Sequence, residues 1–270
     1  NVSQPQRSFM PQPRHFRYPI HAIERFGRKV YSDALHRLGF VPHSMPAQGA
    51  RFLVDTADYI DSCIAYDGMW EAPQLEFLAE VATTRNIDLF LDIGANTGFY
   101  GIMFAVKRLT PEIIAFEPDP GNFARLNANL KASNLEGAVV ATPLALGDRD
   151  SDVVLHQGAT WNRGESTIAV PEQTPREVAF TVRQIRFDDE YSYSGKSIII
   201  KIDVEGYEFN TIAGLERTLR QNACLLQIEL YSDRFEELKA LLSGLGYRYL
   251  HTEYIDHFFT NMTGELPKPA

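Results

Sequence analysis

Two acidic residues follow two apolar segments at a spacing that suits nucleoside binding. The first apolar run, Leu89 to Ile93, contains Asp92 and passes into a glycine-containing loop. Glu117 ends a second apolar run, in Ala-Phe-Glu-Pro-Asp, about 25 residues after the first. A carboxylate at the end of a strand can accept hydrogen bonds from both hydroxyls of a ribose. The pattern therefore predicts a nucleoside lying across the ends of two parallel strands.

The loop after Asp92 distinguishes between cofactor classes. A dinucleotide site uses Gly-x-Gly-x-x-Gly, whose second glycine lets helix amides approach a pyrophosphate. Here Asn96 stands in place of that glycine, and Phe99 stands in place of the third. The negative charge of Asp92 suits the cationic amino-acid end of S-adenosylmethionine better than a pyrophosphate. A nicotinamide or flavin site and a strand-helix turn without a ligand are the alternatives.

A second group of charged residues ends a later apolar run. In Lys201-Ile-Asp-Val-Glu-Gly206, the alternation of a strand places Lys201, Asp203 and Glu205 on one side. Burying three charges is costly unless they pair or bind something. The cluster therefore predicts a reactive or ligand-binding edge of a sheet. A structural Lys-Asp ion pair followed by a helix start is the alternative interpretation.

The elements that must position these residues alternate between strand and helix. This order predicts a doubly wound, mostly parallel α/β sheet with one antiparallel strand in a closing hairpin. Two alternating stretches around a polar loop, within residues 152–187, predict a β-hairpin insertion. The expected strands are 89–93, 113–116, 138–143, 197–203, 223–230, 247–250 and 256–260, and the expected helices are 20–38, 73–83, 99–108, 120–132, 209–220 and 233–242.

Length and composition limit the domain organisation. A chain of 270 residues with 44% hydrophobic content can form one large core with a small appendage. We expect an N-terminal extension at residues 1–65, a proline-rich arm plus a helix, that caps the cavity or forms a homodimer contact. The cofactor-binding domain is expected at residues 66–265.

Charge and cysteine content exclude several classes of protein. The formal net charge is −9 and no Lys/Arg block occurs, which argues against a nucleic-acid surface. Cys63 and Cys224 are the only cysteines, so no disulfide framework or metal cluster is predicted. No apolar stretch is long enough to span a membrane, and no secretory signal opens the chain, so a cytoplasmic location is the default expectation. The first residue is Asn1 rather than Met, which leaves a removed leader open.

Taken in order, the motifs resemble those of the FkbM-type methyltransferases, class I enzymes that use S-adenosylmethionine. The resemblance covers about residues 66–250, and Asp-Val-Glu-Gly after Ile-Lys-Ile is its most specific element. It implies a Rossmann-like fold. The motifs that carry it are Leu-Asp-Ile-Gly-Ala-Asn-Thr-Gly, Ala-Phe-Glu-Pro-Asp, Ala145-Leu-Gly-Asp148, Ile-Lys-Ile-Asp-Val-Glu-Gly and Gln227-Ile-Glu229.

The resemblance also implies roles for individual residues. The glycine loop would hold the methionine part of the cofactor, Glu117 its ribose, and Ala145 to Asp148 would lie near the adenine. Asp203 and Glu205 would face the transferred methyl group or the acceptor, and Glu229 would border the acceptor pocket. The cofactor site would comprise Asp92, Gly94, Ala95, Asn96, Gly98, Glu117, Pro118, Ala145, Leu146, Asp148 and Asp203.

The expected reaction is O-methylation of a hydroxyl on a sugar, a glycan or a secondary metabolite. Asp203 or Glu205 would be the base or the acceptor anchor, and Lys201 would stabilise the developing alkoxide. Arg163 and Glu165 interrupt the loop that is glycine- and serine-rich in the family, so the acceptor does not follow from the resemblance. No metal site is predicted, although Asp203, Glu205 and Glu229 could bind Mg²⁺ with waters.

Three other functions stay open at this point. One is a nucleoside-binding module that performs no transfer, and another is an NAD-dependent oxidoreductase. The third is an RNA 2′-O-methyltransferase, which the acidic balance disfavours.

Overall fold

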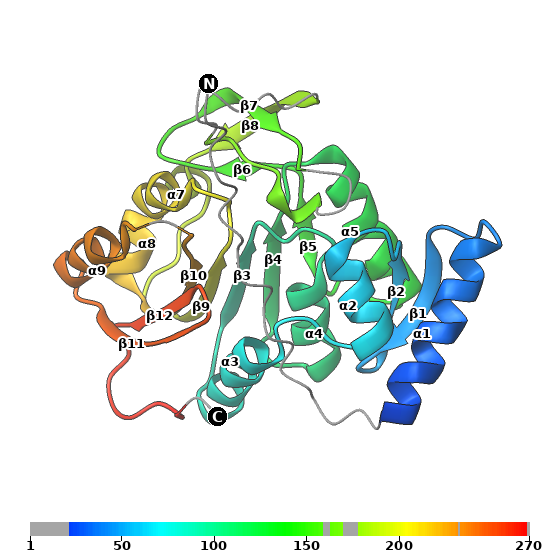
Figure 1. Cartoon of the computed structure of the whole chain (residues 1–270). Helices are drawn as coiled ribbons and strands as arrows, with labels where there is room; N and C mark the ends of the chain where they lie inside the picture. The colour runs from blue at the N-terminus through cyan, green and yellow to red at the C-terminus, as the bar shows by residue number, and fades with distance from the viewer. Residues whose placement is uncertain (1–21, 159–162, 170–177, 232, 269–270) are drawn as a thin grey trace, which may run out of the picture.

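The computed structural model describes residues 22–158, 163–169, 178–231 and 233–268 (Figure 1). A seven-stranded sheet of order β11-β12-β10-β9-β3-β4-β5 forms its centre. Its pairs are parallel except those of β12, which runs antiparallel to both neighbours. The sheet comprises β3 (Leu89–Ile93), β4 (Glu112–Phe116), β5 (Val140–Thr142), β9 (Ser197–Ile202), β10 (Ala223–Glu229), β11 (Arg248–Glu253) and β12 (Asp256–Thr260).

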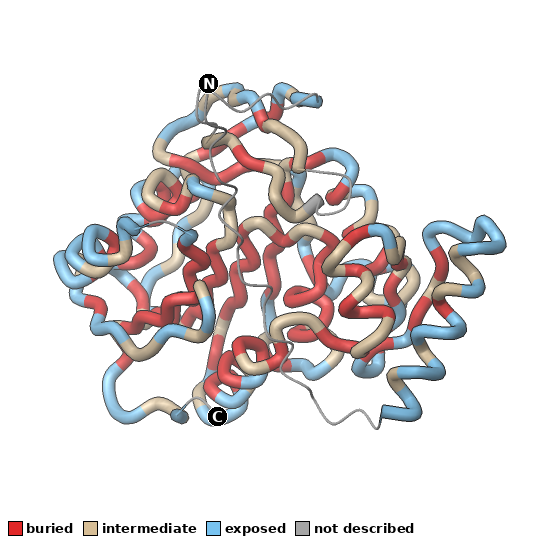
Figure 2. The backbone as a smooth tube through the Cα atoms, in the orientation of Figure 1, coloured by how far each residue is buried: buried red, intermediate tan, exposed pale blue. Residues whose placement is uncertain are grey.

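Helices cover both faces of this sheet, and the strands between them are buried (Figure 2). Alternation sends Phe90 and Ile199 to one hydrophobic core, and Leu91 and Ile200 to the other. The helices α3 (Ala72–Thr84), α4 (Phe99–Lys107) and α5 (Pro120–Ala132) pack in the first core, and α7 (Glu208–Gly214), α8 (Glu216–Gln221) and α9 (Phe235–Gly244) pack in the second. The predicted doubly wound, Rossmann-like fold is confirmed.

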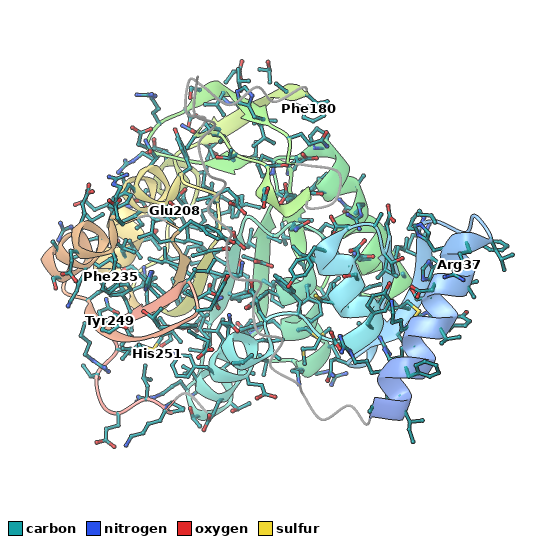
Figure 3. All side chains as sticks on the ribbon, viewed as in Figure 1. Arg37, Phe180, Glu208, Phe235, Tyr249 and His251 are labelled. Atoms are coloured by element: carbon teal, nitrogen blue, oxygen red, sulfur yellow. The ribbon has the colours of Figure 1, made fainter. Side chains whose placement is uncertain are left out.

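The helix α9 packs against the closing hairpin, β11 and β12, at the edge of the sheet. Phe235 of α9 packs against Tyr249 of β11 with ring centroids 5.5 Å apart, and both side chains are labelled in Figure 3. Phe235 also contacts the ring of His257 in β12 at 4.5 Å. The antiparallel strand β12 thus lies between β10 and β11, and β11 and β12 form the closing hairpin that the sequence predicts.

The helix expected over residues 209–220 is wrong as a single element, because it is divided into α7 and α8. A Cβ on Gly214 would lie 2.0 Å from the carbonyl oxygen of Gly147, so the chain packs too closely there for another side chain. The carboxylate of Asp188 accepts hydrogen bonds from the backbone N–H groups of Arg217 and Thr218, at 2.6 and 3.0 Å. Asp188 therefore caps α8 as a separate helix.

The predicted β-hairpin insertion is confirmed and is larger than expected. Strands β7 (Ser151–His156) and β8 (Ala179–Ile185) pair antiparallel, and the short β6 (Ala145–Leu146) joins them, parallel to β8. This three-stranded sheet lies at the top of Figure 1, above the ends of β3 and β4. Part of the intervening loop lies outside the described residues, and a 3-10 turn, Arg163–Glu165, follows that gap. After β8 comes the short α6 (Phe187–Glu190).

The N-terminal part contains more structure than the sequence indicated. The predicted helix is α1 (Ala22–Arg37), whereas the proline-rich arm lies outside the described residues. The hairpin of β1 (His43–Ala47) and β2 (Ala50–Val54) and the helix α2 (Tyr59–Asp67) were not predicted. Phe52 and Ile64 share the core that α4 and α5 occupy, and α2 crosses the expected boundary after residue 65. The division at that residue stays a prediction. Within the described ranges, no helix has both the length and the apolar character needed to cross a membrane.

Candidate active site

A large cavity opens where the parallel strands end. Its wall includes Ile93 at the end of β3, Phe116 at the end of β4, Asp203 after β9 and Glu229 at the end of β10. The carboxyl ends of strands are where open α/β sheets bind ligands. The cavity volume is about 1930 Å³, whereas a site for one small molecule usually occupies ~300–1,000 Å³. There is space for a cofactor and an acceptor side by side.

Glu117 lies at one end of this cavity, held in place by backbone amides. Its two carboxylate oxygens accept hydrogen bonds from Asn96 N at 2.7 Å and from Asp119 N at 2.8 Å. Burial raises the pKa of Glu117 to about 8, although both hydrogen bonds act in the opposite direction. Each oxygen keeps a second lone pair, so the carboxylate can also accept bonds from the hydroxyls of a ribose.

The glycine loop brings an unpartnered acceptor to the same place. Gly94 N and Ala95 N both donate to the carbonyl oxygen of Phe116, at 3.0 and 2.9 Å, which fixes the loop against β4. Asn96 has a φ of +50°, and its buried Oδ1 has no hydrogen-bond partner among the described residues. A buried acceptor of this kind needs a donor. An S-adenosylmethionine, which brings ribose hydroxyls and an ammonium group, fits these residues.

A row of polar side chains crosses the middle of the sheet beside the cavity. Asp92 of β3 stands opposite Lys201 of β9, and Lys201 stands opposite Gln227 of β10. Lys201 Nζ donates to Asp203 Oδ2 at 2.5 Å and lies 4.9 Å from the centre of the Tyr100 ring. Burial lowers the pKa of Lys201, but the carboxylates of Asp203, Glu71 and Asp92 outweigh it and raise the pKa above its usual value. The buried ammonium group therefore stays charged.

Asp92 is buried beside α4 and does not line the cavity. It is 1% exposed, and its Oδ2 accepts a hydrogen bond from Gly101 N at 3.0 Å. Burial raises its pKa to about 6, against the opposing charge of Lys201. The cavity wall includes Gly94, Asn96, Glu117, Pro118, Ala145, Leu146, Asp203, Glu205 and Glu229, whereas Asp92, Ala95, Gly98, Asp148 and Lys201 are not part of it.

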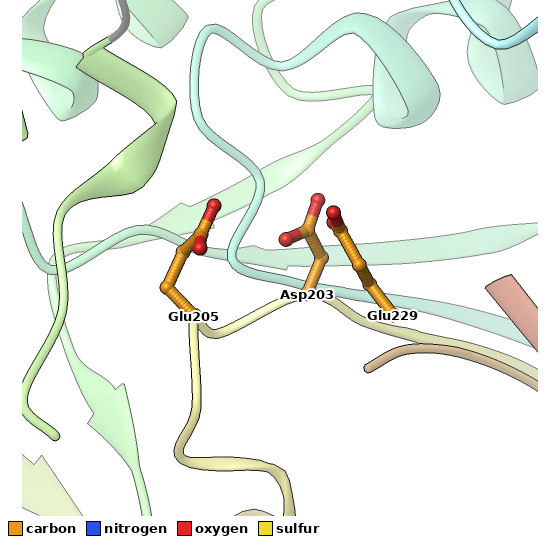
Figure 4. Close-up of side chains that lie close together, drawn as sticks. All are labelled: Asp203, Glu205 and Glu229. Carbon is orange, nitrogen blue, oxygen red and sulfur yellow. The ribbon is translucent and has the colours of Figure 1, made fainter. Parts of the chain in front are cut away.

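Three carboxyl groups of the cavity wall lie close together (Figure 4). One oxygen each of Asp203, Glu205 and Glu229 lies within 4.8 Å of the others, an arrangement that could hold a divalent cation. Burial raises the pKa of Glu229 well above its usual value, and so does its hydrogen bond to Asp203. Burial acts the same way on Asp203, but the Lys201 charge prevails and lowers the pKa of Asp203. A protonated Glu229 thus donates to an ionised Asp203.

Glu205 has a different environment, because it lies in a tight loop between β9 and α7. Its φ is +52°, and its backbone carbonyl accepts a hydrogen bond from Thr167 Oγ1 of the insertion at 2.5 Å. Burial, followed by the negative charge of Asp203, raises the pKa of Glu205 to about 9. The insertion therefore positions a carboxyl group that the strand-end motif supplies.

Sequence reasoning missed a second set of polar groups on the α3 side of the cavity. Tyr100 donates to Glu71 Oε2 at 2.7 Å, and Gln227 donates to Asp256 Oδ1 at 2.8 Å. Gln74 Nε2 donates to the other oxygen of Asp256 at 3.0 Å. The sequence could have indicated Gln227, because it is two residues before Glu229 and its side chain is therefore on the same side of the strand. The others come from distant segments with no motif.

Comparisons with known proteins agree on one class of enzyme. The model of the Methyltransferase FkbM domain matches residues 92–249. Hexuronic acid methyltransferase AglP of Haloferax volcanii is 26% identical over 158 residues, which cover 57% of this chain and 61% of that protein. Methyltransferase 1 of Beauveria bassiana is 26% identical over 188 residues, or 62% of this chain and 75% of that protein.

Among solved structures, Methyltransferase FkbM from Methylobacillus flagellatus aligns with a TM-score of 0.45 at 18% identity. The alignment covers 65% of this chain and 43% of that one. The chain therefore spans less than two thirds of both AglP and the Methylobacillus protein.

Proposed function

The chain belongs to the FkbM family of S-adenosylmethionine-dependent methyltransferases, and on that basis we propose that it methylates a hydroxyl oxygen of a sugar, a glycan or a secondary metabolite. The observation that carries the proposal is the group of three carboxyls in the cavity, two of them after β9, the strand next to β3, and one at the end of β10. S-adenosylmethionine, when bound, supplies an electrophilic methyl group. The chain must then align a hydroxyl with that group and take up its proton.

In this proposal the cofactor site is formed by Gly94, Asn96, Glu117 and Pro118, with Ala145 and Leu146 beside the adenine. Glu117 would receive the ribose hydroxyls and Asn96 Oδ1 would accept a cofactor hydrogen. Asp92 would act from behind the loop, since its carboxylate holds the start of α4 through Gly101 N.

Asp203 and Glu205 have different roles in the transfer. Asp203 is kept ionised by Lys201 and anchors the acceptor hydroxyl. Glu205 accepts the hydroxyl proton, because a cationic cofactor nearby favours the ionised form of a carboxyl whose pKa is otherwise about 9. Lys201 is not in the cavity wall, so it acts on the acceptor through Asp203 rather than directly on an alkoxide.

A sugar acceptor is supported by the name of one relative, the hexuronic acid methyltransferase of Haloferax volcanii. At 26% identity the likeness indicates a class of acceptor and not an individual sugar. The charge of the chain also points away from nucleic acid, because a formal net charge of −9 repels a phosphate backbone.

The test is methyl transfer from labelled S-adenosylmethionine to a panel of glycosides, with S-adenosylhomocysteine quantified and the methylated atom identified by NMR. Asp203→Asn and Glu205→Gln should each lower turnover by ~10²-fold or more while binding of S-adenosylhomocysteine is retained. Glu236→Gln, at an exposed position of α9 that is not part of the cavity wall, is the matched control. Full turnover in both active-site variants would contradict the assigned roles, and cofactor binding without transfer to any acceptor would favour a binding module.

We propose further that the transfer uses no divalent cation. Lys201 already pairs with Asp203, and the carboxyl groups of Asp203 and Glu229 are hydrogen-bonded to each other, so a metal ion would have to displace both contacts. Turnover measured after dialysis against EDTA should equal turnover in added Mg²⁺. Loss of turnover in EDTA, with recovery on Mg²⁺ addition, would assign the three carboxyls to a metal ion instead.

A further inference from the structure

The lining of the cavity also includes a group of aromatic side chains from the N-terminal part and the closing hairpin. We call this the aromatic wall, and it consists of Tyr59 and Tyr66 of α2, Trp70 after α2, and Tyr254 in the β11–β12 turn. The rings of Tyr59 and Trp70 meet edge to face, with centroids 5.6 Å apart and an interplanar angle of 89°. One ring thus supports the other. The cofactor residues Gly94, Asn96 and Glu117 belong to other segments, the ends of β3 and β4.

The charges that line the cavity are strongly unbalanced. Of its described lining residues, ten are acidic and three are basic. Glu71 and Glu253 are in the same segments as the aromatic wall, directly beside Trp70 and Tyr254. An anion bound at this wall would be partly desolvated, and the same cost already raises the pKa of Glu71, next to Trp70, to about 8.

The three basic residues are already engaged. Arg25 pairs with Asp67, Lys29 Nζ lies 3.1 Å from Asp33 Oδ2, and Arg234 pairs with Glu237 at 2.6 Å. Lys201 is buried, does not line the cavity and pairs with Asp203. Among the side chains that the structure describes, each cation near the wall therefore has a carboxylate partner, which a carboxylate of a substrate would have to displace.

We propose that the aromatic wall is the acceptor site and that it selects an uncharged sugar ring over a sugar acid. The apolar C–H face of a pyranose packs on the ring of Trp70 or Tyr59, and the acidic lining excludes a carboxylate or phosphate substituent. This inference rests on the proposed methyl transfer to a sugar hydroxyl and adds the charge class of that sugar.

The experiment measures binding rather than turnover. Matched methyl glycosides and methyl glycosiduronates of glucose, galactose and mannose differ by CH₂OH against COO⁻ at one carbon. Each is titrated into the full chain saturated with S-adenosylhomocysteine, with affinity read by saturation-transfer NMR and calorimetry. At least one neutral glycoside should bind at least tenfold more tightly than its uronate partner. Equal or tighter binding of the uronates, or no binding of any neutral glycoside, would overturn the proposal.

Variants connect the binding to the aromatic wall. Trp70→Ala should weaken binding of the neutral glycoside at least tenfold, and Trp70→Phe should recover most of it. Tyr31→Ala, at an exposed position on α1 that is not part of the cavity wall, is the matched control. Affinity for S-adenosylhomocysteine should be unchanged in all three, which excludes misfolding. Unchanged glycoside binding by Trp70→Ala would place the acceptor elsewhere.

The outcomes separate this inference from the proposed function. Binding of a neutral glycoside without methyl transfer counts against the methyl transfer and leaves the acceptor site in place. Transfer to an acceptor that does not compete with the neutral glycosides counts against the acceptor site alone.

Discussion

A single ammonium group, that of Lys201, determines which of the surrounding carboxyls carry charge. Asp203 pairs directly with this ammonium group, and its pKa is lowered. Within the described part of the chain, Glu229 and Glu205 form no ion pair with Lys201, and burial raises their pKa values. The sequence motif alone treats Lys201, Asp203 and Glu205 as equivalent charges. Their register, contacts and burial assign different protonation states to them at neutral pH.

Removing that ammonium group should be costly to the fold. We expect Lys201→Met to lower the free energy of unfolding by about 3–5 kcal/mol, because it leaves Asp203 buried without its partner. Lys196→Met is the control, since Lys196 pairs with Asp88 at 3.5 Å on the surface and should cost at most about 1 kcal/mol. Urea denaturation of the two variants measures the difference. Equal midpoints would show that Asp203 does not depend on Lys201.

A second residue-scale prediction concerns the nucleoside. Glu117→Gln replaces one carboxyl oxygen at the end of the cavity with an NH₂ group that cannot accept a hydrogen bond, so S-adenosylhomocysteine should bind about tenfold more weakly, as expected for the loss of one hydrogen bond. Glu112→Gln, at the exposed start of the same strand, should bind it normally. Calorimetry gives both affinities. Normal binding by Glu117→Gln would remove Glu117 from the ribose site.

At the scale of elements, continuous apolar runs were the most reliable signal. Residues 89–93 form a strand with the predicted bounds because β3 is buried on both faces, and all its residues are apolar except the buried Asp92. The β1–β2 hairpin was not predicted, because a proline such as Pro46 is uncommon inside a strand. In addition, its turn depends on positive φ values of +49° at Gln48 and +88° at Gly49.

Local sequence patterns also predict only part of the candidate site. Strand-end motifs place Asp203, Glu205 and Glu229 together, since the ends of parallel strands share one edge of the sheet. Glu71 and Asp256 join them only through the packing of α3 and β12, which no local pattern encodes. The aromatic wall was likewise not predictable, because its residues come from segments that become neighbours only in the folded chain.

The turn between β3 and α4 supports a prediction about elements. Gly94 has a φ of +80°, and an added Cβ would lie 1.7 Å from the carbonyl oxygen of Asp203. Gly137 has a similar φ of +84° with nothing within 4 Å of its Cβ position. Gly137→Ala should therefore cost about 1–2 kcal/mol of left-handed strain alone, whereas Gly94→Ala should cost at least about 3 kcal/mol, since overpacking adds to the strain.

Denaturation midpoints of Gly94→Ala and Gly137→Ala measure the difference in stability between the two variants. Equal costs would mean that the loop relaxes away from Asp203 without penalty. Cofactor affinity measured in parallel should fall for Gly94→Ala and stay unchanged for Gly137→Ala.

At the scale of the whole molecule, the excess of acids is concentrated in the functional cavity. Glu71, Glu117 and Glu205 have pKa values of about 8, 8 and 9, each raised chiefly by burial from an ordinary value of 4.5. The folded chain retains protons that the unfolded chain has already lost. The unliganded enzyme therefore has a destabilised, acidic centre that favours binding of a cation.

The sign of the resulting pH dependence follows from these shifts. Between about pH 5 and pH 8 the folded state binds more protons than the unfolded state, so stability decreases as the pH rises, by up to ~1.4 kcal/mol per pH unit for each proton. Denaturation at pH 5.5 and pH 8 should show the higher stability at pH 5.5, with a smaller difference for Glu205→Gln. A flat or rising profile would mean that these carboxyls are ionised in the folded chain.

The contact between Gly94 and the Asp203 carbonyl has a consequence for the evolution of the enzyme. It joins the turn that would receive the methyl donor to the turn that carries the carboxyls, through backbone atoms alone. The spacing between donor and acceptor groups is thereby insulated from changes in side chains. Substitutions at Tyr59 and Trp70 can therefore change the acceptor while this backbone contact is kept, which makes the scaffold a suitable starting point for directed evolution.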